Sequence, residues 1–353
     1  MLIHFYMGNY ESSEGIIIFN LLASNNDTET QEAENPNTDK RFKPQDLKSA
    51  IIFGAKTRGR SDFFKNLLFM RHFVLNSSKD SQKENEIDME PFRLNTDTIK
   101  TPIEFEVFFL YENIQYRYGF EIDQHKVVAE WLYQTPEDEE VELFFRSELD
   151  LDIIHPEKFK KGDFAVDEGL VKDNTLLLPI AAQLNDENAI NVINWFKSLK
   201  TISGLKEEGY QGYTMNRTQE SETMLRIMEF LKVDHFGIQE NKSKLPDIES
   251  LPKYLPQEVK ERIIRQAKEK NLNNHISDTN SSTKAEESSD AKKMFALTGP
   301  IFDILENGSL LVIDELDSKL PPNLVRKLVS LFNSKELNPK NAQLIYNTHD
   351  TNI

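Results

Sequence analysis

Two short apolar runs, each followed at once by polar side chains, constrain the fold of this chain more than any other feature. The first is Leu310–Ile313, which leads straight into the adjacent carboxylates of Asp314 and Glu315. The second is 344–346, about thirty residues further on, which leads into Asn347. Uninterrupted apolar runs of this length are typical of buried strands. We therefore expect two buried strands that carry acid and polar groups to a site.

Strand-like patterns dominate the front of the chain. Apolar and polar side chains alternate at 103–111, 114–122 and 127–134, which predicts an antiparallel β-meander. Shorter apolar runs at 2–6 and 16–19 predict an opening hairpin.

Helical periodicity dominates from about residue 157 onward. The helices expected there are 189–200, 220–231, 256–270, 297–306 and 323–332. The stretch 271–293 is rich in Asn, Ser, Asp and Lys and predicts a loop or linker. We expect three regions: an N-terminal lobe at 1–150, a helical insertion or lid at 151–285, and a C-terminal lobe at 286–353.

Charge and residue content exclude several classes of protein. The formal net charge of −17 argues against broad nucleic-acid binding, which phosphate neutralisation drives, and leaves only a local basic patch open. The absence of cysteine excludes disulfides and thiolate metal sites. No apolar run approaches the ~20 residues of a membrane span, and the start lacks a signal-peptide pattern. We expect a cytoplasmic protein with no membrane partner.

A turn with two glycines lies between a strand expected at 50–53 and a helix that opens near Ser61. This is the arrangement of a phosphate-binding loop, where backbone N–H groups and a helix N-terminus hold phosphate oxygens. The loop residues are Gly54, Ala55, Lys56, Thr57, Arg58, Gly59, Arg60 and Ser61. Their spacing fits GxxxxGK[ST], with Arg60 as the phosphate-binding cation in place of lysine, although its planar fork fits less closely. A strand-to-helix turn without a ligand has the same spacing, and this segment alone does not separate the two.

The two buried strands favour the phosphate-binding interpretation. Asp314 would hold Mg²⁺ through water together with Ser61, and Glu315 would orient or deprotonate the attacking water. His349, which follows the second strand, would sense the γ-phosphate. An acid pair at an ordinary strand end is common, but that explanation leaves the apolar run before it and the second strand unexplained. The three elements together favour a nucleotide-hydrolysing site that uses Mg²⁺.

On these residues the chain resembles the ABC/SMC-type ATPase heads of the AAA-like ATPase families, many of which belong to bacterial anti-phage or abortive-infection systems and sit beside a nuclease partner. The segments that carry the likeness are Met1–Phe5, Phe19–Ser24, Ile52–Ala55, Pro102–Glu106, Tyr116–Phe120, Glu306–Gly308, Ile313–Ser318 and Asn338–Asp350. The resemblance implies an α/β fold of the P-loop NTPase, ABC-ATPase-head type, with a mixed central sheet, an antiparallel β-meander and a helical insertion. It also implies a head-to-tail homodimer with ATP at the interface, where Ser288 of the signature segment would contact nucleotide, and a nuclease or effector protein as a further partner.

The two nucleotide-binding segments depart from that family's pattern. The family's loop resembles GANxSGKS, so Lys56 stands for an asparagine, Arg58 for a small residue and Arg60 for the lysine. The signature segment resembles SxGT followed by a basic residue. In this chain 288–292 places Asp290 where the glycine belongs, and a carboxylate there would repel the γ-phosphate of the partner subunit.

The end of the chain departs as well. After the acidic strand the family often shows LHP, whereas this chain has Leu320–Pro322 and no histidine. The sequence ends at Ile353, where relatives continue, so we expect either a second polypeptide to complete the sheet edge or a shortened product.

Two classes of function fit these residues. The first is an active ATPase with the roles given above, and retention of Glu315 and His349 favours it. The second is a degenerate head that binds nucleotide weakly or not at all and acts as a regulatory or interaction module, and Arg60 and Asp290 favour this one. Direct nuclease action has little support, since no further carboxylate cluster with metal-site spacing is present in the sequence.

Overall fold

The computed structural model describes residues 1–8, 17–22, 47–52, 59–80, 87, 102–137, 139–148, 150–202, 214, 282–314, 316 and 320–348. It describes backbone without side chains at 59–62, 80, 202, 282–293 and 295. The chain divides into two compact units. The first consists of Met1–Ile202, Leu305–Glu315 and Leu328–Thr351, and the second of Ser203–Ile304, Leu316–Lys327 and Asn352–Ile353.

An antiparallel sheet of seven strands is the largest feature of the first unit, in the order β2-β1-β4-β5-β6-β7-β8. The strands are β1 Leu2–Gly8, β2 Ile17–Asn20, β4 Ile103–Tyr111, β5 Ile114–Ile122, β6 Val127–Thr135, β7 Val141–Ser147 and β8 Asp150–Ile154. The opening hairpin and the three alternating strands lie where the sequence predicts them. Every second residue of β4 from Ile103 to Phe109 is buried, which is the period-2 pattern of a half-buried strand.

Two strands at the end of this sheet have no clear signal in the sequence. β8 forms the edge, and its side chains are mostly exposed, with Asp150 and Asp152 among its five residues. Such a strand lacks the alternation by which a half-buried strand is found. Acidic side chains on an edge strand discourage pairing with another chain, so their presence there has a physical reason.

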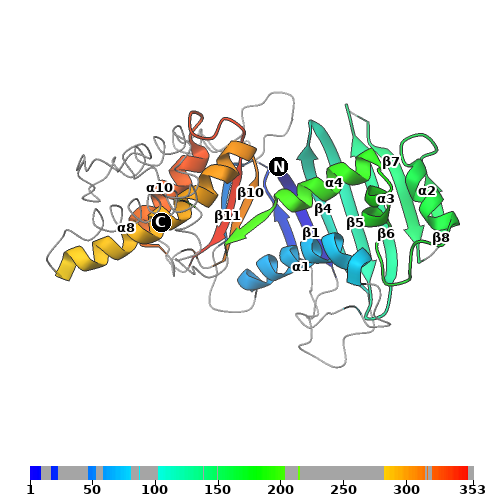
Figure 1. Cartoon of the computed structure of the whole chain (residues 1–353), viewed down its shortest axis with the longest axis horizontal. Coiled ribbons are helices and arrows are strands. Elements are labelled where there is room, and N and C mark those ends of the chain that lie inside the picture. The colour runs from blue at the N-terminus through cyan, green and yellow to red at the C-terminus, as the bar shows by residue number, and fades with distance from the viewer. Residues whose placement is uncertain are drawn as a thin grey trace, which may run out of the picture. The chain divides into compact units, whose positions relative to one another are not determined.

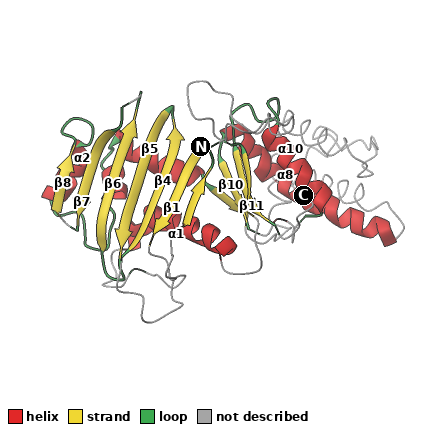
Figure 2. Ribbon diagram, turned by 180° about the vertical axis from the view of Figure 1, so that it is seen from behind, coloured by secondary structure: helices red, strands yellow, loops and turns green. Residues whose placement is uncertain are grey.

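Four helices lie on one face of this sheet (Figure 1). They are α1 Gly59–Asp80, α2 Lys160–Asp167, α3 Leu177–Gln183 and α4 Glu187–Ser198. Figure 2, seen from behind, shows the strands in front of the helices. The side chain of Asp186 caps α4 by accepting a hydrogen bond from the backbone N–H of Ala189 at 3.0 Å. α4 ends two residues before the predicted limit, because Lys200 already belongs to the next strand.

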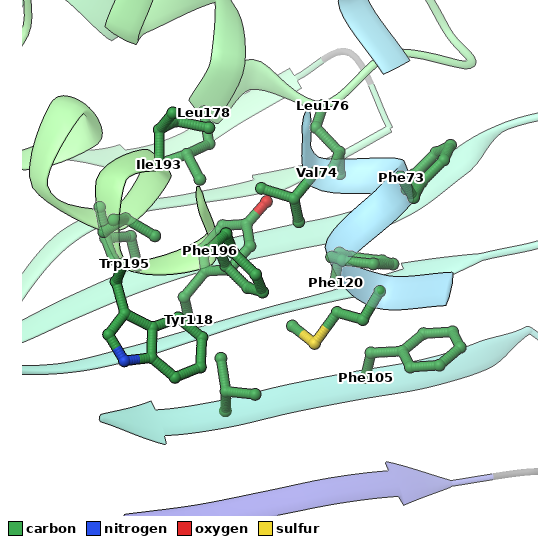
Figure 3. Packing of buried hydrophobic residues seen from close by; sticks show 14 of the residues in the cluster. Phe73, Val74, Phe105, Tyr118, Phe120, Leu176, Leu178, Ile193, Trp195 and Phe196 are labelled. Atoms are coloured by element: carbon green, nitrogen blue, oxygen red, sulfur yellow. The ribbon is translucent and has the colours of Figure 1, made fainter. Parts of the chain in front are cut away.

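Aromatic side chains fill the space between these helices and the sheet (Figure 3). Trp195 of α4 stacks on Phe109 of β4 with ring centroids 4.0 Å apart. Phe73 of α1 packs against Phe120 of β5 at 5.4 Å. α1 has one apolar face, since Leu67 and other residues at helical spacing are fully buried.

A second sheet in the same unit is all parallel and has the order β3-β11-β10-β9. Its strands are β3 Ser49–Ile52, β9 Lys200–Ile202, β10 Leu310–Ile313 and β11 Gln343–Asn347. Every residue of β10 and β11 is buried, as the uninterrupted apolar runs predict. The mixed sheet expected from the sequence is thus divided into an antiparallel and a parallel part.

The side chain of Gln343 joins the two sheets. Its Oε1 accepts a hydrogen bond from the N–H of Leu2 at 2.5 Å, and its Nε2 donates to the carbonyl of Leu2 at 2.9 Å and to that of Leu47 at 3.0 Å. The side-chain amide therefore pairs with β1 as a peptide group of a neighbouring strand would. It connects the first strand of the antiparallel sheet to the central part of the parallel sheet.

The amino ends of β3 and β11 are fixed to the end of α10 (Pro322–Asn333). The Nδ2 of Asn338 donates to the carbonyls of Phe332 and Ala342, at 2.6 and 2.8 Å, and its Oδ1 accepts from the N–H of Ala342 at 2.7 Å. Ser49 at the start of β3 donates its hydroxyl hydrogen to Asn333 Oδ1 at 2.9 Å. These contacts set where both parallel strands begin.

The second unit contains most of α8 (Ser282–Asn307), and this helix corrects a prediction. The sequence predicts a loop over 271–293, whereas the residues from Ser282 onward are helical. The reason is that Ala, Glu and Lys in this polar stretch are strong helix formers, so polarity alone was misleading. The predicted helices at 220–231 and 256–270 lie outside the described residues.

Pro300 stands inside α8 and has no N–H for the carbonyl of Ala296, four residues earlier. The hydroxyl of Thr214 supplies the missing donor, at 2.9 Å from that carbonyl oxygen, and accepts from the N–H of Gly299 at 3.1 Å. A side chain distant in sequence therefore satisfies the backbone group that proline leaves open. Within the part of the chain that can be described, no helix is long and apolar enough to cross a membrane.

Candidate functional site

The carboxyl edge of the parallel sheet brings together the ends of three strands. Ile313, the last residue of β10, is in register with Tyr346 of β11. The next residue of β11, Asn347, is in register with Ile52, the last residue of β3. Ligands of open parallel sheets bind outside the carboxyl ends of the strands, so this edge is the expected place for a site.

Asp314 and Asn347 meet at this edge. The Nδ2 of Asn347 donates a hydrogen bond to Oδ1 of Asp314 at 2.6 Å. Asn347 is 2% exposed and the next residue, Thr348, is 1% exposed, whereas Asp314 is partly exposed. The donor in this contact is neutral, so the contact orients the carboxylate without cancelling its charge.

The side chains of Asp314 and Asn347 belong to one face of the parallel sheet. Side chains alternate along a strand, so they share the face of Val312 and Ile345, which belong to one apolar core with Leu67 of α1. The segment 53–58 connects β3, at the site edge, to the first turn of this helix. The elements that flank the predicted phosphate-binding loop are therefore the ones expected from the sequence.

Several predicted site residues lie outside the described part of the chain. These are Gly54, Ala55, Lys56, Thr57, Arg58, Glu315 and His349. Others have a described backbone without a described side chain: Gly59, Arg60 and Ser61 form the first turn of α1, and Ser288 and Asp290 lie in α8. Asp314 is the one predicted site residue whose side chain is described.

The role of Asn347 was not found from the sequence, although a signal for it exists. Leu310 is in register with Gln343, and each of these strand starts is followed by a polar residue four positions later. Once the two strands are taken as parallel neighbours in this register, Asp314 and Asn347 must lie side by side. Neither apolar run by itself shows how β10 and β11 are aligned with each other.

The chemistry of the donors fits a magnesium ion. Carboxylate oxygens are hard ligands of the kind Mg²⁺ prefers, and Asp314 brings such a group to the carboxyl edge of the parallel sheet. Among the residues with described side chains, no group of three or more His, Cys, Asp or Glu could hold a metal ion.

A second acidic residue, Glu130 of β6, is buried far more deeply. It is 0% exposed and accepts hydrogen bonds from the hydroxyl of Tyr118 at 3.0 Å and from Nε of Arg146 at 2.9 Å. The backbone N–H groups of Leu177 and Leu178, at the start of α3, donate to its two oxygens at 2.7 and 3.0 Å. Burial, with the charge of Glu130, raises the pKa of Tyr118 well above its usual value. Both oxygens of this carboxylate already accept hydrogen bonds from protein groups. The carboxylate therefore connects α3 to the sheet and offers no site for a ligand.

The fold and the edge of the parallel sheet define an α/β protein with a candidate site at the ends of its parallel strands. Residues 61–353 match the model of the family described as "AAA domain, putative AbiEii toxin, Type IV TA system". The chain belongs to this family, and an AAA-family domain has the α/β fold of a P-loop NTPase. The resemblance found in the sequence is thereby confirmed at the level of the family. No curated protein matches the chain.

The matched range has a consequence for the site. It begins at Ser61 and contains Asp314, Glu315 and His349, but it leaves out residues 54–60. The family match therefore bears on the acidic strand and the strand after it. It does not test the loop in which Arg60 replaces lysine.

Proposed function

We propose that the chain is an ATP-binding head that uses Mg²⁺ and hydrolyses ATP at a rate lowered by Arg60 and Asp290. The ABC-head type of the fold is part of this proposal. The observation that carries it is the register of the parallel sheet. Asn347 stands beside the last residue of β3, from which the predicted phosphate loop leaves, and its amide holds Asp314.

Each residue has a defined task in this proposal. The loop 54–61 binds the phosphates through backbone N–H groups, the positive end of α1 and the guanidinium of Arg60. Ser61 and Asp314 hold Mg²⁺, which neutralises charge that develops on the phosphate oxygens. Glu315 orients and deprotonates the attacking water, and His349 contacts the terminal phosphate. The buried strand β10 and the hydrogen bond from Asn347 keep Asp314 in place.

The second candidate function is a regulatory or interaction module that no longer turns over ATP. Three changes in the phosphate loop favour it, namely Lys56, Arg58 and Arg60. Asp290 favours it too, because a carboxylate near a γ-phosphate is repelled at close range. In this second candidate function, the hydrogen bond between Asp314 and Asn347 stabilises the edge of the parallel sheet and has no part in catalysis.

Calorimetric titration of the intact chain with ATP, with and without Mg²⁺, is the first test. The proposal predicts that Mg²⁺ tightens ATP binding and that Asp314→Asn removes this effect. If ATP binds in neither condition, the chain is an interaction module and the proposal fails.

Turnover is tested by reversing the two departures. Arg60→Lys combined with Asp290→Gly should raise the ATPase rate by at least about tenfold, since a lost electrostatic contact to the transition state costs 2–4 kcal/mol. The single variants Arg60→Lys and Asp290→Gly are the controls, since each shows how much of the change in rate comes from one position. A double variant with unchanged binding and turnover would favour the module.

The partners in this proposal are a second copy of the chain and an effector. ATP would lie between the loop of one subunit and Ser288 of the other, so Glu315→Gln should accumulate a dimer with ATP and Mg²⁺ in size-exclusion chromatography. An unchanged dimer fraction would show that Glu315 is not the water-activating base.

The family description names a toxin of a toxin–antitoxin system. This supports a role in bacterial defence by abortive infection, beside a nuclease or effector protein. Phage challenge of cells that produce the wild type or Glu315→Gln tests it. Equal protection by both would contradict a role for hydrolysis in defence.

A further inference from the structure

We infer that Asn347 is a positioning residue for the metal site: its amide fixes the Asp314 carboxylate in the orientation that binds Mg²⁺, and couples it to the strand that precedes the phosphate loop. The inference rests on the proposed function, since it concerns the same ion. It adds a residue to which the sequence pattern assigns no task.

The contact has the properties that a positioning contact needs. It is short, 2.6 Å from Asn347 Nδ2 to Asp314 Oδ1, and it comes from a side chain that is almost fully buried. A buried side chain has few alternative conformations, so it can hold a partly exposed partner in one orientation. Because an amide is neutral, this contact places no positive charge beside the Asp314 carboxylate. A lysine or arginine in the same place would compete with the ion.

The neighbours of Asn347 extend the contact to the other motif. β11 lies between β3 and β10, and Asn347 is in register with Ile52 at the last position of β3. The same residue therefore touches the metal-binding strand through its side chain and adjoins the start of the phosphate loop through its backbone.

The opposite end of β11 supplies a matched control. Gln343 is also a buried amide, lies on the same face of β11, and forms hydrogen bonds with Leu2 and Leu47 instead of Asp314. Loss of either amide removes buried hydrogen bonds from the same strand. Of the two amides, only Asn347 bonds to Asp314, so only its loss should change the orientation of Asp314.

The experiment uses the intact chain, ATP, and Mn²⁺ as a spectroscopic substitute for Mg²⁺. Electron paramagnetic resonance follows bound Mn²⁺ during titration of the wild type, Asn347→Ala, Asp314→Asn and Gln343→Ala, and calorimetry measures ATP binding in EDTA. We expect Asn347→Ala to raise the Mn²⁺ concentration for half-saturation by about tenfold, the lower limit for partners of metal ligands. ATP binding in EDTA should be unchanged, and Gln343→Ala should titrate like the wild type. Asn347→Leu, which fills the volume without a donor, replaces Asn347→Ala if the alanine variant does not fold.

The outcomes separate this inference from the proposed function. If Asn347→Ala titrates like the wild type while Asp314→Asn loses Mn²⁺, the positioning role is wrong and the ATP–metal site stands. If Asn347→Ala and Gln343→Ala weaken Mn²⁺ binding equally, the effect is one of strand packing and the positioning role is again wrong. If the wild type binds no Mn²⁺ with ATP, the proposed function fails and the inference fails with it.

Discussion

Glu130 in the antiparallel sheet and Asp314 in the parallel sheet are both carboxylates at the boundary between strand and helix layers, and they differ in what surrounds them. Glu130 is fully buried and accepts from four protein donors, one of them the guanidinium of Arg146. Asp314 is partly exposed at a strand end and accepts from the neutral amide of Asn347. A carboxylate saturated with protein donors stabilises the fold, whereas one oriented by a neutral donor at a sheet edge is suited to a cation. Burial of an acid is therefore a poor guide to function unless its partners are counted.

The largest loss of stability is expected from Arg146→Met. Removal of the guanidinium leaves Glu130 buried without a counter-charge, and breaking a buried pair in this way costs about 3–5 kcal/mol. Two further hydrogen bonds, to the carbonyls of Glu148 and Thr175, are lost as well. Urea unfolding followed by circular dichroism measures the change in the free energy of unfolding.

Arg117→Met on the same sheet is the matched control. Its ion pair with Glu140 joins side chains that are 27% and 42% exposed, and exposed pairs contribute about 1 kcal/mol or less. Similar losses of unfolding free energy for Arg146→Met and Arg117→Met would contradict the distinction between a buried, fully hydrogen-bonded ion pair and an exposed one.

Gly119→Ala should destabilise the antiparallel sheet by about 1–3 kcal/mol through overpacking. An added Cβ would lie 2.5 Å from the indole ring of Trp131 and 2.7 Å from the carbonyl oxygen of Phe105. Thermal unfolding measures the effect. Gly169→Ala is the control, since it has nothing within 4 Å and only the strain of φ +63°, about 1 kcal/mol. A smaller loss at Gly119 than at Gly169 would show that Trp131 moves freely.

Asp314→Asn should change stability by less than about 1 kcal/mol, because the new amide oxygen still accepts from Asn347. Urea unfolding of this variant without nucleotide measures that value. A loss as large as that of Arg146→Met would mean that Asp314 is a structural acid like Glu130, and that the contrast between the two is mistaken.

The smallest effect is expected from Glu104→Gln on the face of the antiparallel sheet away from the aromatic core. Burial, with the charges of Glu121 and Glu106, raises the pKa of Glu104. Glu104 and Glu121 are directly opposite in register, an unfavourable arrangement of like charges. The native state therefore binds protons more tightly than the unfolded state, so the stability from this group is present at low pH and falls as the pH rises through the raised value.

Glu104→Gln should accordingly stabilise the protein by about 0.5 kcal/mol at pH 7 and leave its stability at pH 4 nearly unchanged. Unfolding in urea across this pH range is the measurement. Destabilisation at pH 7 would show that the carboxylate has a favourable role in the folded protein.

Much of the fold follows from local patterns. Period-2 alternation located β4, β5 and β6, and uninterrupted apolar runs located β10 and β11. Gly308, which follows the end of α8, has φ +62°, a conformation that glycine adopts without strain. These signals are local because the pattern of apolar residues within each strand, or the glycine in the turn, is enough to predict the element.

The missed features depend on contacts between distant segments. The connection between the two sheets depends on Gln343, whose partner Leu2 is 341 residues away. The pairing of Asn347 with Asp314 depends on the register of two strands, and the saturation of Glu130 on the start of α3. Polar residues give no periodic signal for such contacts. In the candidate site Asp314 was predictable because it ends an apolar run, while its partner was not.

The strand order of the parallel sheet also determines when the sheet can form. β11 lies between β3 and β10, so β3 has no partner in this sheet until residues 343–347 are present. During synthesis β1 can pair with β4 after about a third of these residues, but β3 must wait for almost all of them. Contacts of such long range slow folding and leave an apolar strand exposed in the meantime. The strand order that brings the site together therefore leaves β3 without its sheet partner for most of synthesis, so β3 needs protection from aggregation during that time.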